Sequence, residues 1–311
     1  MPYSNRLLLA VLTAWVLACA QLATASELLQ LAPGVWRVAG ENAAIGPANL
    51  GAVANTGIIA TGEGLIVIDP GPTLARGQAI AALAMTVSAE SVRWVIDSHA
   101  HPENVLANSA FPQAIVIASS AAANLMKSRC ATCLQRLTDQ VGEAATGGTA
   151  IVVPTRLVRH GEVMTLGQRT LLFQVFDRAH TRGDLAVFLP QTGILFAGGL
   201  ANDARVPDLR EADLSGWITA LERLKKLSVQ SVVPGHGAAT DGAILQKFGA
   251  YLTDLRQACD ADIANRGDAA SSGARLGLPQ YRTWVEYAAQ HPLNVAHAYR
   301  EREDAQLMGE K

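Results

Sequence analysis

The chain has 311 residues, of which 50% are hydrophobic and 17% are charged, and its formal net charge is −2. This is the composition of a globular protein, and it excludes a disordered or collagen-like chain. The sequence has no dense run of Lys or Arg, so it gives no support for a nucleic-acid-binding surface.

The first 25 residues have the three parts of a secretory signal peptide. Arg6 provides a positive start, residues 7–20 form an apolar core of 14 residues, and small residues at 23–25 suit a cleavage site. This core is short for a membrane-spanning helix, although a retained anchor is the alternative. We therefore expect a mature protein of residues 26–311, in the bacterial periplasm or secreted, with no membrane attachment. It has 24 basic and 27 acidic side chains, a balance of −3.

The first half of the mature chain alternates apolar strands with helices. Apolar runs on both sides of Gly62-Glu63-Gly64 predict a hairpin. The apolar run VRWVID (92–97) predicts a buried strand that leads directly into His99. The expected elements are strands at 34–40, 55–71 (the hairpin), 92–97 and 114–119, a helix at 74–88, and a second helix that ends near 136.

The second half repeats this organisation. Its apolar runs predict strands at 170–176, 185–190, 193–199 and 231–235, and helices at 214–228, 241–266 and 280–303, with a Gly/Ser-rich linker at 267–277. Two strand-rich halves with helices predict two sheets packed face to face with helices outside. The fold class is α/β (α+β), a four-layer αββα sandwich. We expect one domain over 26–311, with helix 280–303 as an appended tail.

Three cysteines remain after the signal peptide, namely Cys130, Cys133 and Cys259. The first two form a CxxC motif, but the second CxxC of a zinc site is missing, and the context is helical rather than thioredoxin-like. In a compartment that permits disulfides, the sequence favours a structural disulfide, with a redox or regulatory role as the alternative. Which two cysteines pair is not readable.

Four of the seven histidines follow directly after a predicted strand: His99, His101, His180 and His236. Loops at strand ends are where rigid sheets position functional groups. The other three, His160, His291 and His297, we interpret as surface or capping residues. Imidazole favours zinc among common biological ions, so the four strand-end histidines predict a zinc site.

The segment HAHPEN (99–104) adds detail to this site. Residues i and i+2 of an extended segment face the same side, so His99 and His101 can converge on one ion. Pro102 suits the first position of a helix. Such a helix turns Glu103 and Asn104 towards the same point.

Four motifs together resemble the metallo-β-lactamase superfamily. They are HAHPEN (99–104), AHTRGD (179–184), LFAGG (195–199) and VVPGHG (232–237). More narrowly, HPENVLANSAF (101–111), the cysteine pair and NVAHAYRERE (294–303) resemble secreted metallohydrolases associated with quinoprotein relay and sulfur oxidation. The resemblance implies the αββα fold and a zinc-activated water that attacks a carbonyl-type carbon.

The resemblance also implies which residues hold metal. The ligands of the first zinc are His99, His101 and His180. At the places of the second zinc's ligands the chain has Glu103, Asn104, Gly199 and His236. Glycine has no side chain to bridge two cations, and an amide oxygen is a poor zinc ligand, so we expect one zinc ion and no second one.

Two carboxylates are candidates for catalytic roles. Glu103 is a candidate general base for the water. Asp184, four residues after His180, either orients that histidine from behind or caps the turn.

The sequence favours an enzyme, a zinc-dependent hydrolase of a small ester, lactone, thioester or amide-type substrate. The alternative is a catalytically degenerate relative that binds a ligand or partner. The resemblance implies a periplasmic quinoprotein or sulfur-oxidation system as the partner.

Overall fold

A computed structural model describes residues 28–238 and 240–308. The predicted signal peptide lies outside these residues. No helix of the described part combines the length and apolarity that crossing a bilayer requires.

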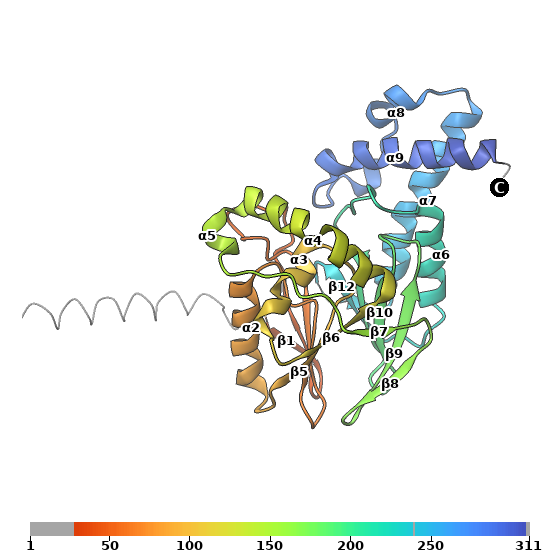
Figure 1. The fold of residues 1–311 in the computed structure, drawn as a ribbon. Coiled ribbons are helices and arrows are strands. Elements are labelled where there is room, and N and C mark those ends of the chain that lie inside the picture. Colours follow the sequence, from red (N-terminus) through yellow and green to blue (C-terminus); the bar gives the residue numbers. More distant parts are fainter. Residues whose placement is uncertain (1–27, 239, 309–311) are drawn as a thin grey trace, which may run out of the picture.

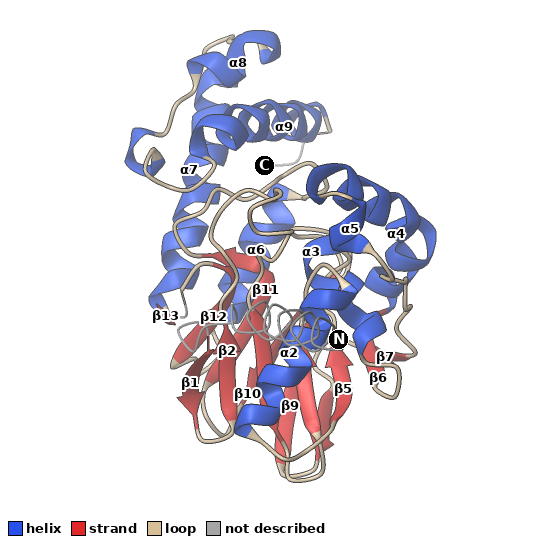
Figure 2. Ribbon diagram, turned by 90° about the vertical axis from the view of Figure 1, so that its left-hand side faces the viewer, coloured by secondary structure: helices blue, strands red, loops and turns tan. Residues whose placement is uncertain are grey.

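Two β-sheets form the centre of the molecule (Figures 1 and 2). Within the described residues, the first sheet has seven strands in chain order: β1 (Leu28–Ala32), β2 (Val35–Val38), β3 (Thr56–Ala60), β4 (Leu65–Ile68), β5 (Val92–Ile96), β6 (Ile115–Ser119) and β7 (Arg156–Val158). The second has six, in the order β13 (Thr240–Asp241), β12 (Ser231–His236), β11 (Ile194–Asn202), β10 (Asp184–Leu189), β9 (Arg169–Phe176) and β8 (Val163–Leu166). Strands β4 to β7 run parallel, as do β11 and β12, whereas the other neighbours are antiparallel.

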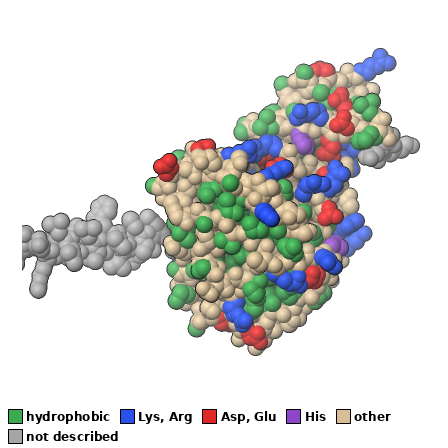
Figure 3. Space-filling model, viewed as in Figure 1, with side chains coloured by type: hydrophobic (Ala, Val, Ile, Leu, Met, Phe, Trp, Pro, Cys, Tyr) green, Lys and Arg blue, Asp and Glu red, His purple; other side chains and the backbone are tan. Residues whose placement is uncertain are grey.

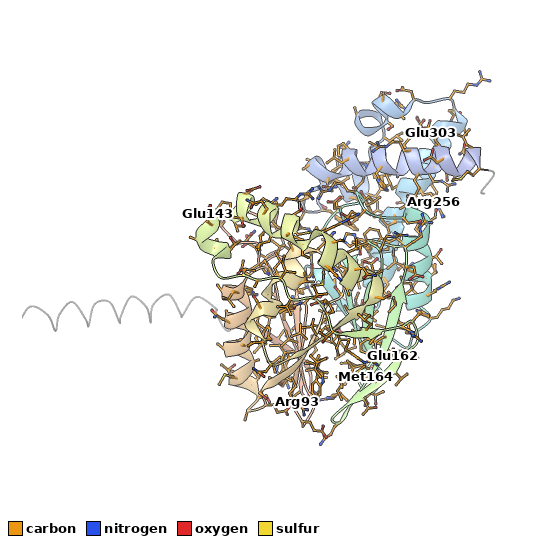
Figure 4. All side chains as sticks on the ribbon, in the orientation of Figure 1. Arg93, Glu143, Glu162, Met164, Arg256 and Glu303 are labelled. Carbon is orange, nitrogen blue, oxygen red and sulfur yellow. The ribbon has the colours of Figure 1, made fainter. Side chains whose placement is uncertain are left out.

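The two sheets pack face to face through an apolar core. Trp94 of β5, Phe173 of β9 and Val187 of β10 belong to one buried cluster to which both sheets contribute. Side chains fill this space, and Arg93, at the start of β5, lies at the lower end of the sandwich in Figure 4. Strand β5 therefore runs from that end towards the opposite one, where it delivers His99.

Helices cover the outer faces of both sheets, which confirms the predicted αββα sandwich. Helix α2 (Leu74–Val87) packs on the first sheet through Ile80 and Ala84. Helices α6 (Leu214–Leu224) and α7 (Ala243–Ala264) pack on the second sheet. The short helices α3 (Pro102–Val105), η2 (Leu106–Ala110) and α5 (Glu143–Thr146) and the long helix α4 (Ser120–Val141) follow β5 and β6.

The C-terminal helices form an extension above the sandwich (Figure 1). It consists of α8 (Ala269–Arg275), η3 (Pro279–Tyr281) and α9 (Tyr287–Leu307). These helices pack on α7 and on one another rather than on either sheet. The tail predicted at 280–303 is thus present, although its long helix begins seven residues later.

The predicted linker at 267–277 contains helix α8, which is a correction. Its start is capped by Asp268, whose side chain accepts a hydrogen bond from the Ser271 backbone at 3.0 Å. An ion pair joins Arg275 to Asp262 of α7, and α8 packs closely on α9. Tertiary contacts therefore stabilise a helix whose Gly/Ser content argues against one.

Candidate metal centre

Three of the predicted histidines meet at the upper end of the sandwich. His99 and His101 follow β5, and His180 lies in the turn between β9 and β10. Each offers a ring nitrogen, and these three atoms lie within 4.8 Å of one another. Both histidines of the segment after β5 thus converge as predicted, although residues 98–100 form a bend rather than the extended segment that the prediction assumed.

A hydrogen bond fixes which nitrogen of His99 points into the cluster. Nδ1 of His99 lies 2.9 Å from the Ser98 hydroxyl, which leaves Nε2 for the cluster. Nε2 of His180 lies 3.3 Å from Nδ1 of His101. Two nitrogens bound tetrahedrally to one zinc, each at about 2.0–2.1 Å, are about 3.3–3.4 Å apart. The spacing therefore fits two ligands of one ion.

Burial keeps the imidazoles of His99 and His180 neutral. Desolvation lowers the pKa of His99 and of His180 well below the usual histidine value, and the neighbouring histidines add to the effect. A metal-binding imidazole must be neutral, so no proton has to be displaced from His99 or His180 at neutral pH.

Helix α3, with Pro102 at its first turn, presents Glu103 beside the cluster, whereas Asn104 does not line the cavity. Oε1 of Glu103 lies 3.7 Å from Nδ1 of His101, and the glutamate side chain is only 13% exposed. Asn104 is buried and hydrogen-bonds to Asp69, while its Oδ1 has no partner among the described residues. A neutral amide thus occupies the place that the family resemblance assigns to a metal ligand.

Gly199, in β11, lies directly against two of the histidines. A Cβ atom here would lie 2.5 Å from Cδ2 of His180 and 3.0 Å from Cε1 of His99. Real Cβ atoms do not approach other heavy atoms as closely as 2.5 Å. The histidine rings therefore fill the space that a bridging carboxylate would need, so the missing side chain is part of how the cluster packs.

His236 ends β12 and lines the cavity that His101 and His180 also line, but it is not one of the three clustered histidines. Its Nδ1 lies 2.9 Å from the Val53 carbonyl, which leaves Nε2 for the cavity. Burial and the nearby Arg205 lower the pKa of His236 to about 4. The structure thus places this neutral imidazole in the half of the site where the second metal's ligands are expected.

The Asp184 carboxylate holds the turn that carries His180. It accepts hydrogen bonds from the Thr181 backbone at 2.9 and 3.1 Å and from the Thr181 hydroxyl at 2.6 Å. Burial raises the pKa of Asp184 to about 7. Among the described residues its contacts are those of a cap on the turn next to His180.

His101, His180 and His236 line a cavity of about 690 Å³, whereas His99 is buried behind it. Its wall includes Asn202, Arg205 and, from the C-terminal extension, Glu286. Arg205 forms an ion pair with Glu286 and donates a hydrogen bond to the Ala43 carbonyl at 2.7 Å. Sequence reasoning missed this pair, because two opposite charges far apart in the chain carry no local signal.

The three cysteines are free, so the favoured structural disulfide is not present. Cys130 and Cys133 lie one turn apart in the middle of α4. Cβ atoms at this spacing are about 5–6 Å apart, whereas a disulfide needs about 3.5–4.5 Å. Cys259 belongs to a different buried cluster, beside α6 and α9.

The remaining histidines lie away from the cavity wall. His160 is exposed and His297 half-buried, and each hydrogen-bonds to a backbone carbonyl. His291 is a correction, because it is buried between the Tyr251 hydroxyl and the Leu276 carbonyl, at 3.1 Å from each. It packs the extension onto α7.

Comparisons with known proteins agree with this geometry. The family model described as Metallo-beta-lactamase superfamily matches residues 51–236. The acyl-coenzyme A thioesterase MBLAC2 of Gallus gallus is 32% identical over 90 residues, which is 27% of this chain and 32% of that protein. The metallo-beta-lactamase type 2 of Bacillus cereus is 36% identical over 73 residues, 22% of this chain and 28% of that protein. The chain thus matches about a third of the length of these curated relatives.

A solved structure extends the likeness over most of the chain. It is a metallo-beta-lactamase family protein from Thermus thermophilus, with a TM-score of 0.65 and 16% identity. The match covers 89% of this chain and 96% of that one. At this identity the likeness concerns the fold alone.

Proposed function

The chain belongs to the metallo-β-lactamase superfamily, and on that premise we propose that it is a hydrolase that works with one zinc ion. The observation that carries the proposal is the convergence of His99, His101 and His180, with ligand nitrogens within 4.8 Å of one another. Three protein ligands and an open position for water are the usual arrangement of a catalytic zinc site.

The other half of the cleft supports one ion rather than two. Of Glu103, Asn104, Gly199 and His236, only the glutamate carries a negative charge. Two divalent cations held close together repel each other strongly unless an anionic group lies between them. Position 199 in β11 supplies no such group, and a side chain there would crowd the rings of His180 and His99.

When bound, the ion supplies Lewis acidity, which activates water and polarises the carbonyl under attack. Glu103 accepts the proton of the attacking water, because its carboxylate is nearly buried and lies beside His101. The Asp184–Thr181 contacts keep the His180 ring in place. The proposed substrate is a small ester, lactone, thioester or amide. The cavity volume is in the range of small-molecule sites, and the likeness to a protein named as a thioesterase supports including thioesters.

The proposed setting is the bacterial periplasm, beside a quinoprotein or sulfur-oxidation system. The apolar N-terminal segment and the narrower motif resemblance support this part of the proposal.

A catalytically degenerate binding protein is the second candidate. The observation that favours it is the presence of Asn104 and Gly199 at two of the four places where the family resemblance expects ligands of the second metal.

The decisive test combines zinc content with hydrolysis of a panel of esters, lactones and acyl thioesters. We expect about one zinc ion per chain, and loss of both zinc and hydrolysis in His99→Ala and His180→Ala. The exposed His160 provides the matched control, His160→Ala, which should keep both. Two zinc ions per chain would overturn the single-ion proposal. Bound zinc without hydrolysis across the panel favours the binding protein, and absence of zinc overturns the metal-dependent hydrolase.

A further inference from the structure

Helix α4 presents a thiol to the substrate cavity. Cys133 is half-buried and lines the cavity wall together with Arg129 and Arg136. These residues are spaced at i, i+4 and i+7, so they share one face of the helix. Cys130 lies one turn before Cys133 and is 1% exposed. One thiol is thus accessible from the cavity, and its neighbour is sheltered.

The two thiols are close enough to act on each other. Cα atoms three residues apart in a helix are about 5 Å apart, within the range of about 4.4–6.8 Å that disulfides span. The Cys130 thiol hydrogen-bonds to Cys133. A bond between the two sulfurs therefore requires only local adjustment of α4.

Two neighbours favour negative charge on Cys133. The hydrogen bond from Cys130 lowers the pKa of the Cys133 thiol to about 7 and Arg136 contributes in the same direction, whereas burial and the carboxylates of Glu211 and Glu103 oppose this shift. The Arg129 guanidinium lies 3.4 Å from Glu211, while Arg136 is exposed and has no ion pair among the described residues. Lys and Arg side chains also gather near the junction of the sandwich and the helical extension, on the face shown in Figure 3.

We propose that Cys133 and Cys130 form a dithiol that exchanges with small anionic disulfides entering the cavity. The Cys133 thiolate attacks one sulfur of the disulfide, which forms a mixed disulfide and releases one thiolate. The Cys130 thiol then passes its proton to the thiolate released in the first step and attacks the Cys133 sulfur, which forms the Cys130–Cys133 bond and releases the second thiolate. The protein is oxidised by two electrons and the small disulfide is reduced to two thiols. Arg136 provides the positive charge that selects an anionic reagent.

Because both cysteines lie in helix α4, formation of the Cys130–Cys133 disulfide is readily reversed. The Cβ atoms must approach by about 1–2 Å from their normal helical spacing, so the oxidised pair stores strain. Strained disulfides are the easily reduced ones. This activity goes beyond the proposed hydrolase and does not depend on metal.

The test follows the intact mass of the mature protein, kept without metal, during reaction with oxidised glutathione. The wild type should lose two hydrogens, with the bond mapped to Cys130 and Cys133. Cys130→Ser should stop at one glutathione adduct on Cys133, and Cys133→Ser should form none. Cys259→Ser is the matched control and should behave as the wild type. The rate for the wild type should rise through pH about 7, where the pKa of Cys133 lies.

Two references make the result decisive. A synthetic peptide with the sequence of residues 127–136 lacks the folded surroundings, so it should react more slowly than the protein at pH 7. Arg136→Gln should slow the reaction with oxidised glutathione by about fivefold, the effect of one charge at close range in water. It should not slow the reaction with the cationic disulfide cystamine. Equal rates for protein and peptide, or an adduct that forms first on Cys130, would overturn the proposal.

Discussion

The two halves of the cleft differ in how they are built. The first half has a complete set of three histidines, held by the end of β5 and by the capped turn after β9. The second half has Glu103 on α3, Gly199 in β11 and His236 at the end of β12. Because different elements carry the two halves, one can keep its metal geometry while the other loses its ligands.

The second half is organised by protein contacts instead. Arg205 pairs with Glu286, and the Val206 backbone donates a hydrogen bond to the Val285 carbonyl at 3.0 Å. The C-terminal extension therefore forms part of the wall where the family resemblance places a second ion. This comparison predicts that the first half governs metal binding and the second half governs the water and the substrate.

The largest effect on catalysis is expected from substitution of Glu103, the carboxylate of the second half of the cleft. Glu103→Gln removes the proposed general base, so kcat should fall by about 10²–10⁴-fold, while zinc content stays as in the wild type. Asp139 lines the cavity mouth, and Asp139→Asn is the matched control with normal kcat. Loss of zinc in Glu103→Gln would break the division between the halves, because it would make Glu103 a ligand.

Substitution of Gly199 tests how closely β11, in the second half of the cleft, packs against the histidines of the first half. In Gly199→Ala the new Cβ atom pushes against His180 and His99, so zinc affinity should fall by at least the ~10–100-fold typical of disturbed ligand support. Competition with a zinc chelator measures this affinity. At Gly46 an added Cβ atom would meet no heavy atom within 4 Å, and Gly46→Ala should bind zinc normally. Unchanged affinity in Gly199→Ala would mean that the histidines move freely.

The sequence predicted the site where local geometry determines it. The spacing of His99 and His101, and Pro102 at the start of α3, were enough to predict that these histidines converge, although residues 98–100 are bent rather than extended. The sequence also shows that position 199 lacks a carboxylate. It does not show that the His180 ring occupies the space beside Gly199, because that contact joins two separate segments of the second sheet.

The parts of the fold that were missed depend on tertiary contacts. Strands β7 and β8 have only three and four residues and expose Leu157 and Val163, so neither forms an apolar run long enough to be recognised. Their neighbours β6 and β9 define them as strands. The Arg205–Glu286 pair is missed for the same reason, since it forms only after the extension has packed on α7.

A moderate effect is expected from the support behind the first half. Asp184→Asn presents an amide NH₂ to the Thr181 backbone donor, so the free energy of unfolding should fall by about 1–3 kcal/mol. Chelator competition should also show zinc affinity reduced by about tenfold. Asp177 is exposed, and Asp177→Asn should change neither quantity. Normal zinc affinity in Asp184→Asn would show that the His180 turn is held by other contacts.

The contribution of the Asp184 carboxyl group can also be measured from the pH dependence of stability. Burial raises the pKa of Asp184 from 3.8 to about 7, so the folded protein binds this proton more tightly than the unfolded chain does. The contribution to stability is complete below pH about 4 and is lost as the pH rises through about 7. Denaturant unfolding of the metal-free protein between pH 4 and 8 should show this loss. Asp184→Asn should reduce the slope over that range, and an unchanged slope would assign it to other groups.

The smallest effect is expected where the extension meets the cavity. Glu286→Gln removes the charge that pairs with Arg205, and the pair is partly exposed, so the loss of stability should be about 1 kcal/mol or less. The guanidinium then becomes available to substrate, so KM should change by about threefold while kcat and zinc content stay constant. Glu303 lies on α9, the helix that follows Glu286 (Figure 4), and Glu303→Gln should leave KM unchanged. A fall in kcat with constant KM would instead place Arg205 in the chemical step. The second half of the cleft would then take part in catalysis as well as in substrate binding.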